Sequence, residues 1–74
     1  MITAKNAYLA TPVGDVGTIA YGGSTNGLAE YERFANEVAV LEGMEDQRVI
    51  EITFRHHESQ TGHRFVDIVK FTRL

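Results

Sequence analysis

Hydrophobic residues are interspersed with polar ones in two stretches near the C-terminus, residues 48–57 and 63–73. Both stretches are rich in valine, isoleucine, phenylalanine and threonine, which favour β-strands, and the polar linker between them ends in Gly62. The pattern predicts an antiparallel β-hairpin, closed by a type I turn at residues 60–61 and a glycine in the left-handed region. This turn sets Arg55 opposite Asp67, a pair of opposite charges that favours the register.

The predicted register gives the hairpin two unequal faces. The expected core side carries Ile50, Ile52, Phe54, His56, Val66, Ile68 and Lys70. The other face mixes the charged or polar residues Glu51, Arg55, His57 and Asp67 with the apolar residues Phe65, Val69 and Phe71. Either the N-terminal segment covers these apolar side chains within one molecule, or the face binds a partner. On the second interpretation the candidate partner-binding residues are Phe65, Val69, Phe71, Arg55 and His57.

Between residues 27 and 42 the hydrophobic period changes to that of an α-helix. One arc of this helix is apolar and consists of Leu28, Tyr31, Phe34, Ala35, Val38, Ala39 and Leu41. The opposite side carries charged residues, and Glu30 and Glu37 mark an acidic face that could engage a basic groove on another protein. Gly43 is the expected C-terminal cap, so that residues 44–47 would form a linker to the hairpin.

Residues 3–11 are compatible with two local structures. Thr3 followed by an alanine-rich segment could begin a short capped helix. Alternatively, residues 3–11 could form a strand that turns at Gly14-Asp15 and pairs with residues 16–21, which would place Tyr8 opposite Tyr21. The favoured interpretation is the hairpin. The glycine- and serine-rich residues 22–27 form a loop, in which Ser24, Thr25 or Asn26 would cap the following helix.

Together these elements predict a single α+β domain over residues 1–74, in the order β-β-α-β-β. One amphipathic helix packs across an antiparallel sheet, and a short helix could replace the first strand. The order of strands between the two hairpins is left open.

Composition narrows the class of protein. The chain has 74 residues, of which 43% are hydrophobic, and it contains no cysteine. No signal peptide is visible, and no apolar stretch approaches the roughly 20 residues that span a bilayer, so we expect a cytoplasmic protein without a membrane partner. The net charge is −3, with a net −5 on residues 1–47 and a net +2 on residues 48–74.

The histidines near the hairpin turn are the nearest approach to a chemical site. Adjacent residues of a strand point to opposite faces, so His56 and His57 cannot readily share a metal ion, and His57 with His63 lacks a third ligand. Gly22-Gly23-Ser24-Thr25 lacks the lysine of a phosphate-binding loop. We therefore expect no metal, no cofactor and no enzymatic activity.

Two functions remain. The favoured one is a small non-enzymatic protein-interaction module, an accessory or regulatory factor that binds another protein, or a second copy as a homodimer, through its sheet face or its acidic helix. The alternative is a nucleic-acid-binding protein that uses the C-terminal hairpin. The basic and histidine residues available for it are Arg48, Arg55, His56, His57, His63, Arg64, Lys70 and Arg73. The overall negative charge makes nucleic acid the less favoured partner.

Overall fold

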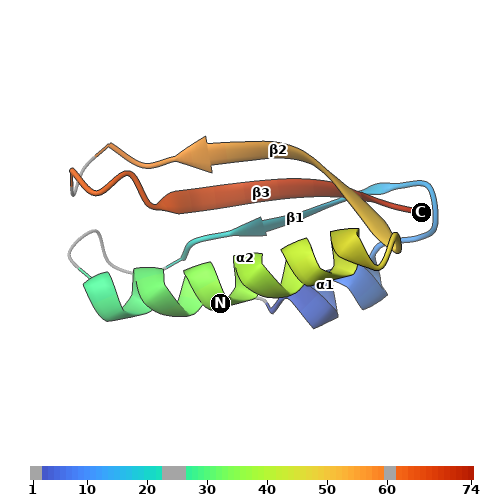
Figure 1. Cartoon of the computed structure of the whole chain (residues 1–74), viewed down its shortest axis with the longest axis horizontal. Coiled ribbons are helices and arrows are strands. Elements are labelled where there is room, and N and C mark those ends of the chain that lie inside the picture. Colours follow the sequence, from blue (N-terminus) through green and yellow to red (C-terminus); the bar gives the residue numbers. More distant parts are fainter. Residues whose placement is uncertain (1–2, 23–26, 60–61) are drawn as a thin grey trace.

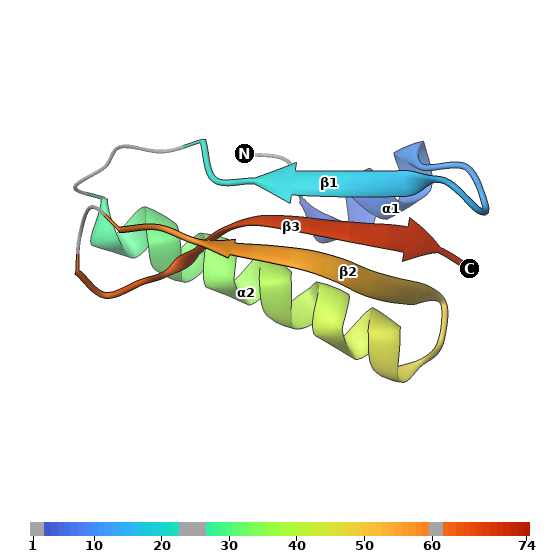
Figure 2. The same ribbon diagram turned by 90° about the horizontal axis from the view of Figure 1, so that it is seen from above.

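The computed structural model describes residues 3–22, 27–59 and 62–74. These residues form α1 (Ala4–Ala10), β1 (Val16–Ala20), α2 (Leu28–Asp46), β2 (Ile50–His57) and β3 (Val66–Arg73). The strands make an antiparallel sheet in the order β1-β3-β2. Both described helices lie on the same face of this sheet, below it in Figure 1 and behind it in Figure 2. The predicted α+β class is confirmed.

The N-terminal segment is a helix, as the alternative interpretation had it, and the favoured hairpin is wrong. The Thr3 hydroxyl oxygen accepts the Asn6 N–H at 3.2 Å, which caps α1. Thr11 then leaves the helical region because it precedes Pro12. Since residues 4–10 are helical, β1 pairs with the central strand β3 rather than with a neighbouring first strand.

Helix α2 confirms the predicted element but is longer than predicted. Gly43 lies inside the helix, and the expected linker residues 44–46 continue it. The left-handed residue that ends the helix is Arg48, with φ 63°. The Arg48 N–H donates to the Glu45 carbonyl at 2.9 Å and the Val49 N–H donates to the Met44 carbonyl at 3.2 Å, which together form a Schellman motif. At the other end, Gly27 is the N-cap residue, and residues 23–26, which include the predicted capping residues, lie outside the described part of the chain.

The C-terminal hairpin is present, but its predicted register is wrong. Arg55 lies opposite Val69 rather than Asp67, and Ile52 lies opposite Phe71. The pairing shifts between Ile52 and Phe54 and again between His56 and His57. The Glu58 N–H donates to the Phe65 carbonyl at 2.8 Å, so the connecting loop is longer than a type I turn with one added glycine.

Gly62 adopts the expected positive φ of 80°, and Arg64 adds a second left-handed residue, with φ 55°. Residues 60–61 of the predicted turn lie outside the described residues.

The change of register reverses the faces of β3 from Ile68 onward and of β2 from Phe54 onward. Val69 and Phe71 are fully buried, whereas Lys70 is exposed on the other side of β3. Ile50, Ile52 and Val66 pack in or against the core as predicted. The buried core is shared by the sheet and both described helices and comprises Ala4, Ala7, Ile19, Phe34, Val38, Leu41, Ile50, Val69 and Phe71.

Gly17 of β1 lies directly opposite Phe71 and beneath its ring. A Cβ atom at this position would overlap with the Phe71 ring and with the Thr11 hydroxyl. Substitution Gly17→Ala should therefore lower the free energy of unfolding by about 1–3 kcal/mol, the usual cost of overpacking a core. Urea denaturation followed by circular dichroism measures this change.

The matched control is Gly43→Ala, because Gly43 is helical and a Cβ atom added there would meet no other atom within 4 Å. This variant should be more stable than the wild type by about 0.5–1 kcal/mol, since alanine is the better helix former. Equal effects of the two substitutions would contradict the close approach of Gly17 and Phe71.

Candidate functional site

The side of the sheet that faces away from α1 and α2 is the candidate site, and we call it the outer sheet face. Residues that lie opposite each other in adjacent strands share a face, and residues two apart along a strand share it as well. The register therefore places three rows across β1, β3 and β2 on this face: Val16–Thr72–Glu51, Thr18–Lys70–Phe54 and Ala20–Ile68–His56.

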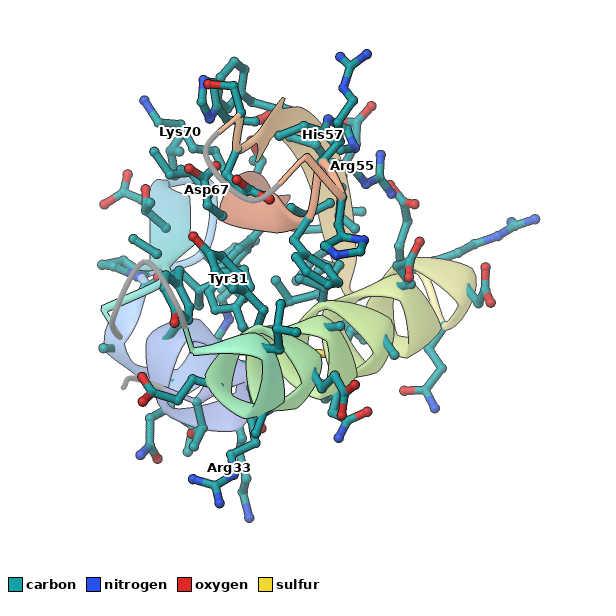
Figure 3. All side chains as sticks on the ribbon, turned by 90° about the vertical axis from the view of Figure 1, so that its left-hand side faces the viewer. Tyr31, Arg33, Arg55, His57, Asp67 and Lys70 are labelled. Atoms are coloured by element: carbon teal, nitrogen blue, oxygen red, sulfur yellow. The ribbon has the colours of Figure 1, made fainter. Side chains whose placement is uncertain are left out.

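Phe54 and Lys70 form the centre of the outer sheet face. Thr53 has no partner in the register of β2 and β3, and this irregularity turns Phe54 to the outer side. Phe54 is 45% exposed, and the Lys70 ammonium lies 5.7 Å from the centre of its ring, within the range of a cation–π contact. Lys70 lies on the far side of the sheet from α2 (Figure 3). An aromatic ring and a cation thus occur side by side on an accessible surface.

At one end of the outer sheet face, His56 contacts Asp67. The His56 Nδ1 lies 2.7 Å from the Asp67 carboxylate, and both side chains are partly accessible. Asp67 is the extra residue at the second irregularity of the hairpin, and its carbonyl accepts the Tyr21 N–H at 2.7 Å. The contact between His56 and the Asp67 carboxylate orients the histidine ring. Among the described residues, no three histidine or acidic side chains come together as a metal site would require.

Phe65 belongs to an aromatic column rather than to the outer sheet face. Tyr31 of α2 is buried and points toward the sheet (Figure 3). Its ring stacks on Tyr21 at 3.8 Å on one side and on Phe65 at 5.0 Å on the other. The His63 ring lies 5.4 Å from Phe65. The column joins the first turn of α2 to the end of the hairpin.

The predicted partner-binding residues do not form one surface. Val69 and Phe71 are fully buried beneath the described helices, so their assignment to an exposed face is wrong. Arg55 lies on the helix side, where its guanidinium is 3.5 Å from the Glu42 carboxylate. His57 is exposed at the end of β2. Val69 and Phe71 are covered within the molecule, but by both described helices rather than by the N-terminal segment alone.

The acidic residues of α2 contact neighbouring elements. The Glu37 carboxylate accepts the Ala4 N–H at 2.8 Å, at the first turn of α1, where the helix dipole favours a negative charge. The Glu45 carboxylate accepts the Ile52 N–H of β2 at 2.8 Å. The negative charge of Glu30 lies close enough to Tyr21 to contribute to the raised pKa of its hydroxyl. Glu30 and Glu37, predicted as an acidic face for a partner, thus contribute to the packing of α2.

The basic residues of the hairpin are divided between several sides of the molecule. The Arg73 guanidinium donates to the carbonyls of Tyr8 and Thr11, at 3.2 and 3.0 Å, and lies 4.2 Å from the centre of the Tyr8 ring. It therefore stabilises the C-terminal end of α1. Lys70 lies on the outer sheet face and Arg55 on the helix side. The continuous basic surface expected of a nucleic-acid-binding hairpin is not formed by these three described residues.

Comparison of the chain with models of protein families, with curated proteins and with solved structures finds no similar protein. Within the described ranges, neither helix combines the length and the apolar character needed to cross a membrane.

Two tyrosines of the aromatic column, Tyr21 and Tyr31, should make the free energy of unfolding depend on pH. Burial raises the pKa of the Tyr21 hydroxyl, and the negative charge of Glu30 adds to the rise. Burial also raises the pKa of Tyr31, with Glu58 and Asp67 as additional causes. In the unfolded chain both hydroxyls ionise near pH 10. The unfolded state therefore loses its protons first, and the stabilisation present below about pH 10 is lost as the pH rises through the raised values.

Urea denaturation between about pH 8 and pH 11 should show this loss, and the double variant Tyr21→Phe, Tyr31→Phe should show a shallower one. The absorbance of tyrosinate, followed against pH in the folded single variants Tyr21→Phe and Tyr31→Phe, assigns each pKa to one of the two tyrosines. A folded protein in which both hydroxyls ionise at or below their ordinary pKa would contradict the buried column.

Proposed function

We propose that this chain is a small non-enzymatic protein-interaction module that binds its partner through the outer sheet face. The observation that supports the proposal most directly is the exposure of Phe54 at the centre of this face, next to Lys70. Both described helices pack against the opposite face, so they contribute no cover to Phe54. Exposed aromatic side chains surrounded by polar residues are typical of protein-binding surfaces.

The composition of the outer sheet face indicates the chemistry of the partner. Ile68 is partly buried between Ala20 and His56, and it extends the apolar area beside Phe54. Lys70 supplies an exposed positive charge within the same area. A partner with an apolar patch and an adjacent carboxylate would bury Phe54 and pair with Lys70 at once. An accessory or regulatory role, in which binding itself is the activity, fits such a surface.

Nucleic-acid binding through the hairpin has weaker support. Arg73 is engaged by α1 and Arg55 by α2, so neither accompanies Lys70 on the outer sheet face. Without these two arginines, Lys70 provides little of the phosphate contact on which such binding depends.

Substitution Phe54→Glu tests the proposal. A glutamate opposite Lys70 is a favourable cross-strand pair, so the fold should be retained while the aromatic contact is lost. The affinity for the partner should fall by at least about tenfold, as for other central aromatic contacts. The measurement is affinity capture with tagged wild type and variant, quantified by mass spectrometry, followed by titration of the captured protein.

Val40→Glu is the matched control, because Val40 is also an apolar residue with 45% exposure but lies on α2. A protein captured by the wild type and by Val40→Glu, but lost with Phe54→Glu, supports the outer sheet face. Capture that is unchanged by Phe54→Glu would contradict it. Capture that is abolished by nuclease and weakens steeply with salt would favour the nucleic-acid alternative.

A further inference from the structure

The main chain of β1 has one side directed away from the sheet. The Tyr21 N–H donates to the Asp67 carbonyl and the Arg73 N–H donates to the Asp15 carbonyl, so the odd-numbered residues of this segment face β3. In an antiparallel pair the residues alternate in direction. The N–H and C=O groups of Val16, Thr18 and Ala20 therefore point outward, and no described strand lies beyond β1 (Figure 2).

The two edges of the sheet differ in how they are protected against further pairing. On β2, the Glu45 carboxylate accepts a hydrogen bond from the outward N–H of Ile52, and the strand contains a bulge-like irregularity at Thr53. Charged residues, bulges and covering groups are the usual means of blocking an edge strand. β1 has a continuous register with β3 over all five residues and contains only the uncharged sequence Val16-Gly-Thr-Ile-Ala20. Among the described residues, the β1 edge thus carries no charge, no bulge and no covering strand.

We propose that β1 pairs with β1 of a second copy of this chain, antiparallel and centred on Thr18. Thr18 then lies opposite Thr18 of the second copy, and Val16 lies opposite Ala20. In this register all the outward N–H and C=O groups of the three residues gain partners. The two sheets join into one continuous sheet in the order β2-β3-β1-β1-β3-β2.

The residues that would meet at this edge are compatible with a second copy. Threonine pairs favour antiparallel strands, and Val16, which is 61% exposed, gains an apolar neighbour. Asp15 would lie opposite Tyr21 of the second copy, so no like charges oppose each other along the strand. Each copy carries a net charge of −3, but residues 16–20 are uncharged, so the repulsive charges do not lie at the contact. The pairing would hold whether or not the outer sheet face binds a partner.

Solution mass and amide hydrogen exchange test the pairing. The mass should rise with protein concentration from 8.2 kDa toward twice that value. Over the same range, the amide protons of Val16, Thr18 and Ala20 should become protected, because they are the donors that the second copy occupies. A mass that stays monomeric at the highest attainable concentration would overturn the proposal.

Thr18→Pro removes an outward N–H and leaves the hydrogen bonds to β3 in place, which is the position where an edge strand tolerates proline. Two donors are lost per dimer, so dimerisation should weaken about tenfold to a hundredfold. Thr18→Val keeps the N–H and should dimerise like the wild type. If Thr18→Pro does not fold, Ala20→Pro removes an equivalent donor. A dimer that is unchanged by a folded proline variant would contradict the β1 contact.

Cysteine crosslinking distinguishes the edge from the outer sheet face, because the chain has no cysteine of its own. Thr18 and Lys70 are neighbours in one row, but Lys70 lies on the central strand. Under mild oxidation Thr18→Cys should form a disulfide-linked dimer, and Lys70→Cys should form much less of it. Preferential crosslinking of Lys70→Cys would place the contact on the outer sheet face and overturn the edge pairing.

Discussion

The fit of the Phe71 ring against Gly17 is the constraint on which the arrangement of the other elements depends. Phe71 lies on the central strand and is fully buried, and its ring needs the space that a side chain on Gly17 would fill. This fit sets the register of β1 against β3 and brings Thr11 alongside. Two residues further on, Arg73 contacts the carbonyls at the end of α1. Alternate residues of β3 thus position both β1 and α1.

The acidic residues of α2 decide between local structures that the sequence alone leaves open. The Glu37 carboxylate accepts the first N–H of α1, and together with the Thr3 cap it favours a helix over a strand at residues 4–10. The Glu45 carboxylate accepts an N–H of β2, which explains why α2 continues past Gly43, a common helix terminator. Since hydrogen bonds to charged groups are stronger than neutral ones, the presence of Glu37 and Glu45 in the helix has a structural explanation. The outer sheet face, rather than the helix, is therefore the candidate surface for a partner.

The sequence predicts the class of fold, α2 and the C-terminal hairpin because strong periodicity carries these features. It does not predict the hairpin register. A register inferred from the turn alone assumes regular pairing along both strands, and the irregularities at Thr53 and Asp67, which break that pairing, have no recognisable sequence signal. The sequence does contain one indication against the predicted register, because that register places the polar residues His56 and Lys70 on the core side. The structure places both on the outer sheet face. The same error of register assigns Phe54, the centre of the candidate site, to the core.

β1 contributes to both proposed surfaces, the outer sheet face and the β1 edge, through the side chains and the main chain of the same residues. The side chains of Val16, Thr18 and Ala20 belong to the outer sheet face, whereas their main-chain groups form the edge. A second copy paired at the edge would therefore place two outer sheet faces next to each other without covering either. Since Phe54 and Lys70 are separated from that edge by β1, the pairing would leave them accessible. Self-association and partner binding are thus compatible, and a dimer would present two copies of the partner-binding surface on one continuous sheet.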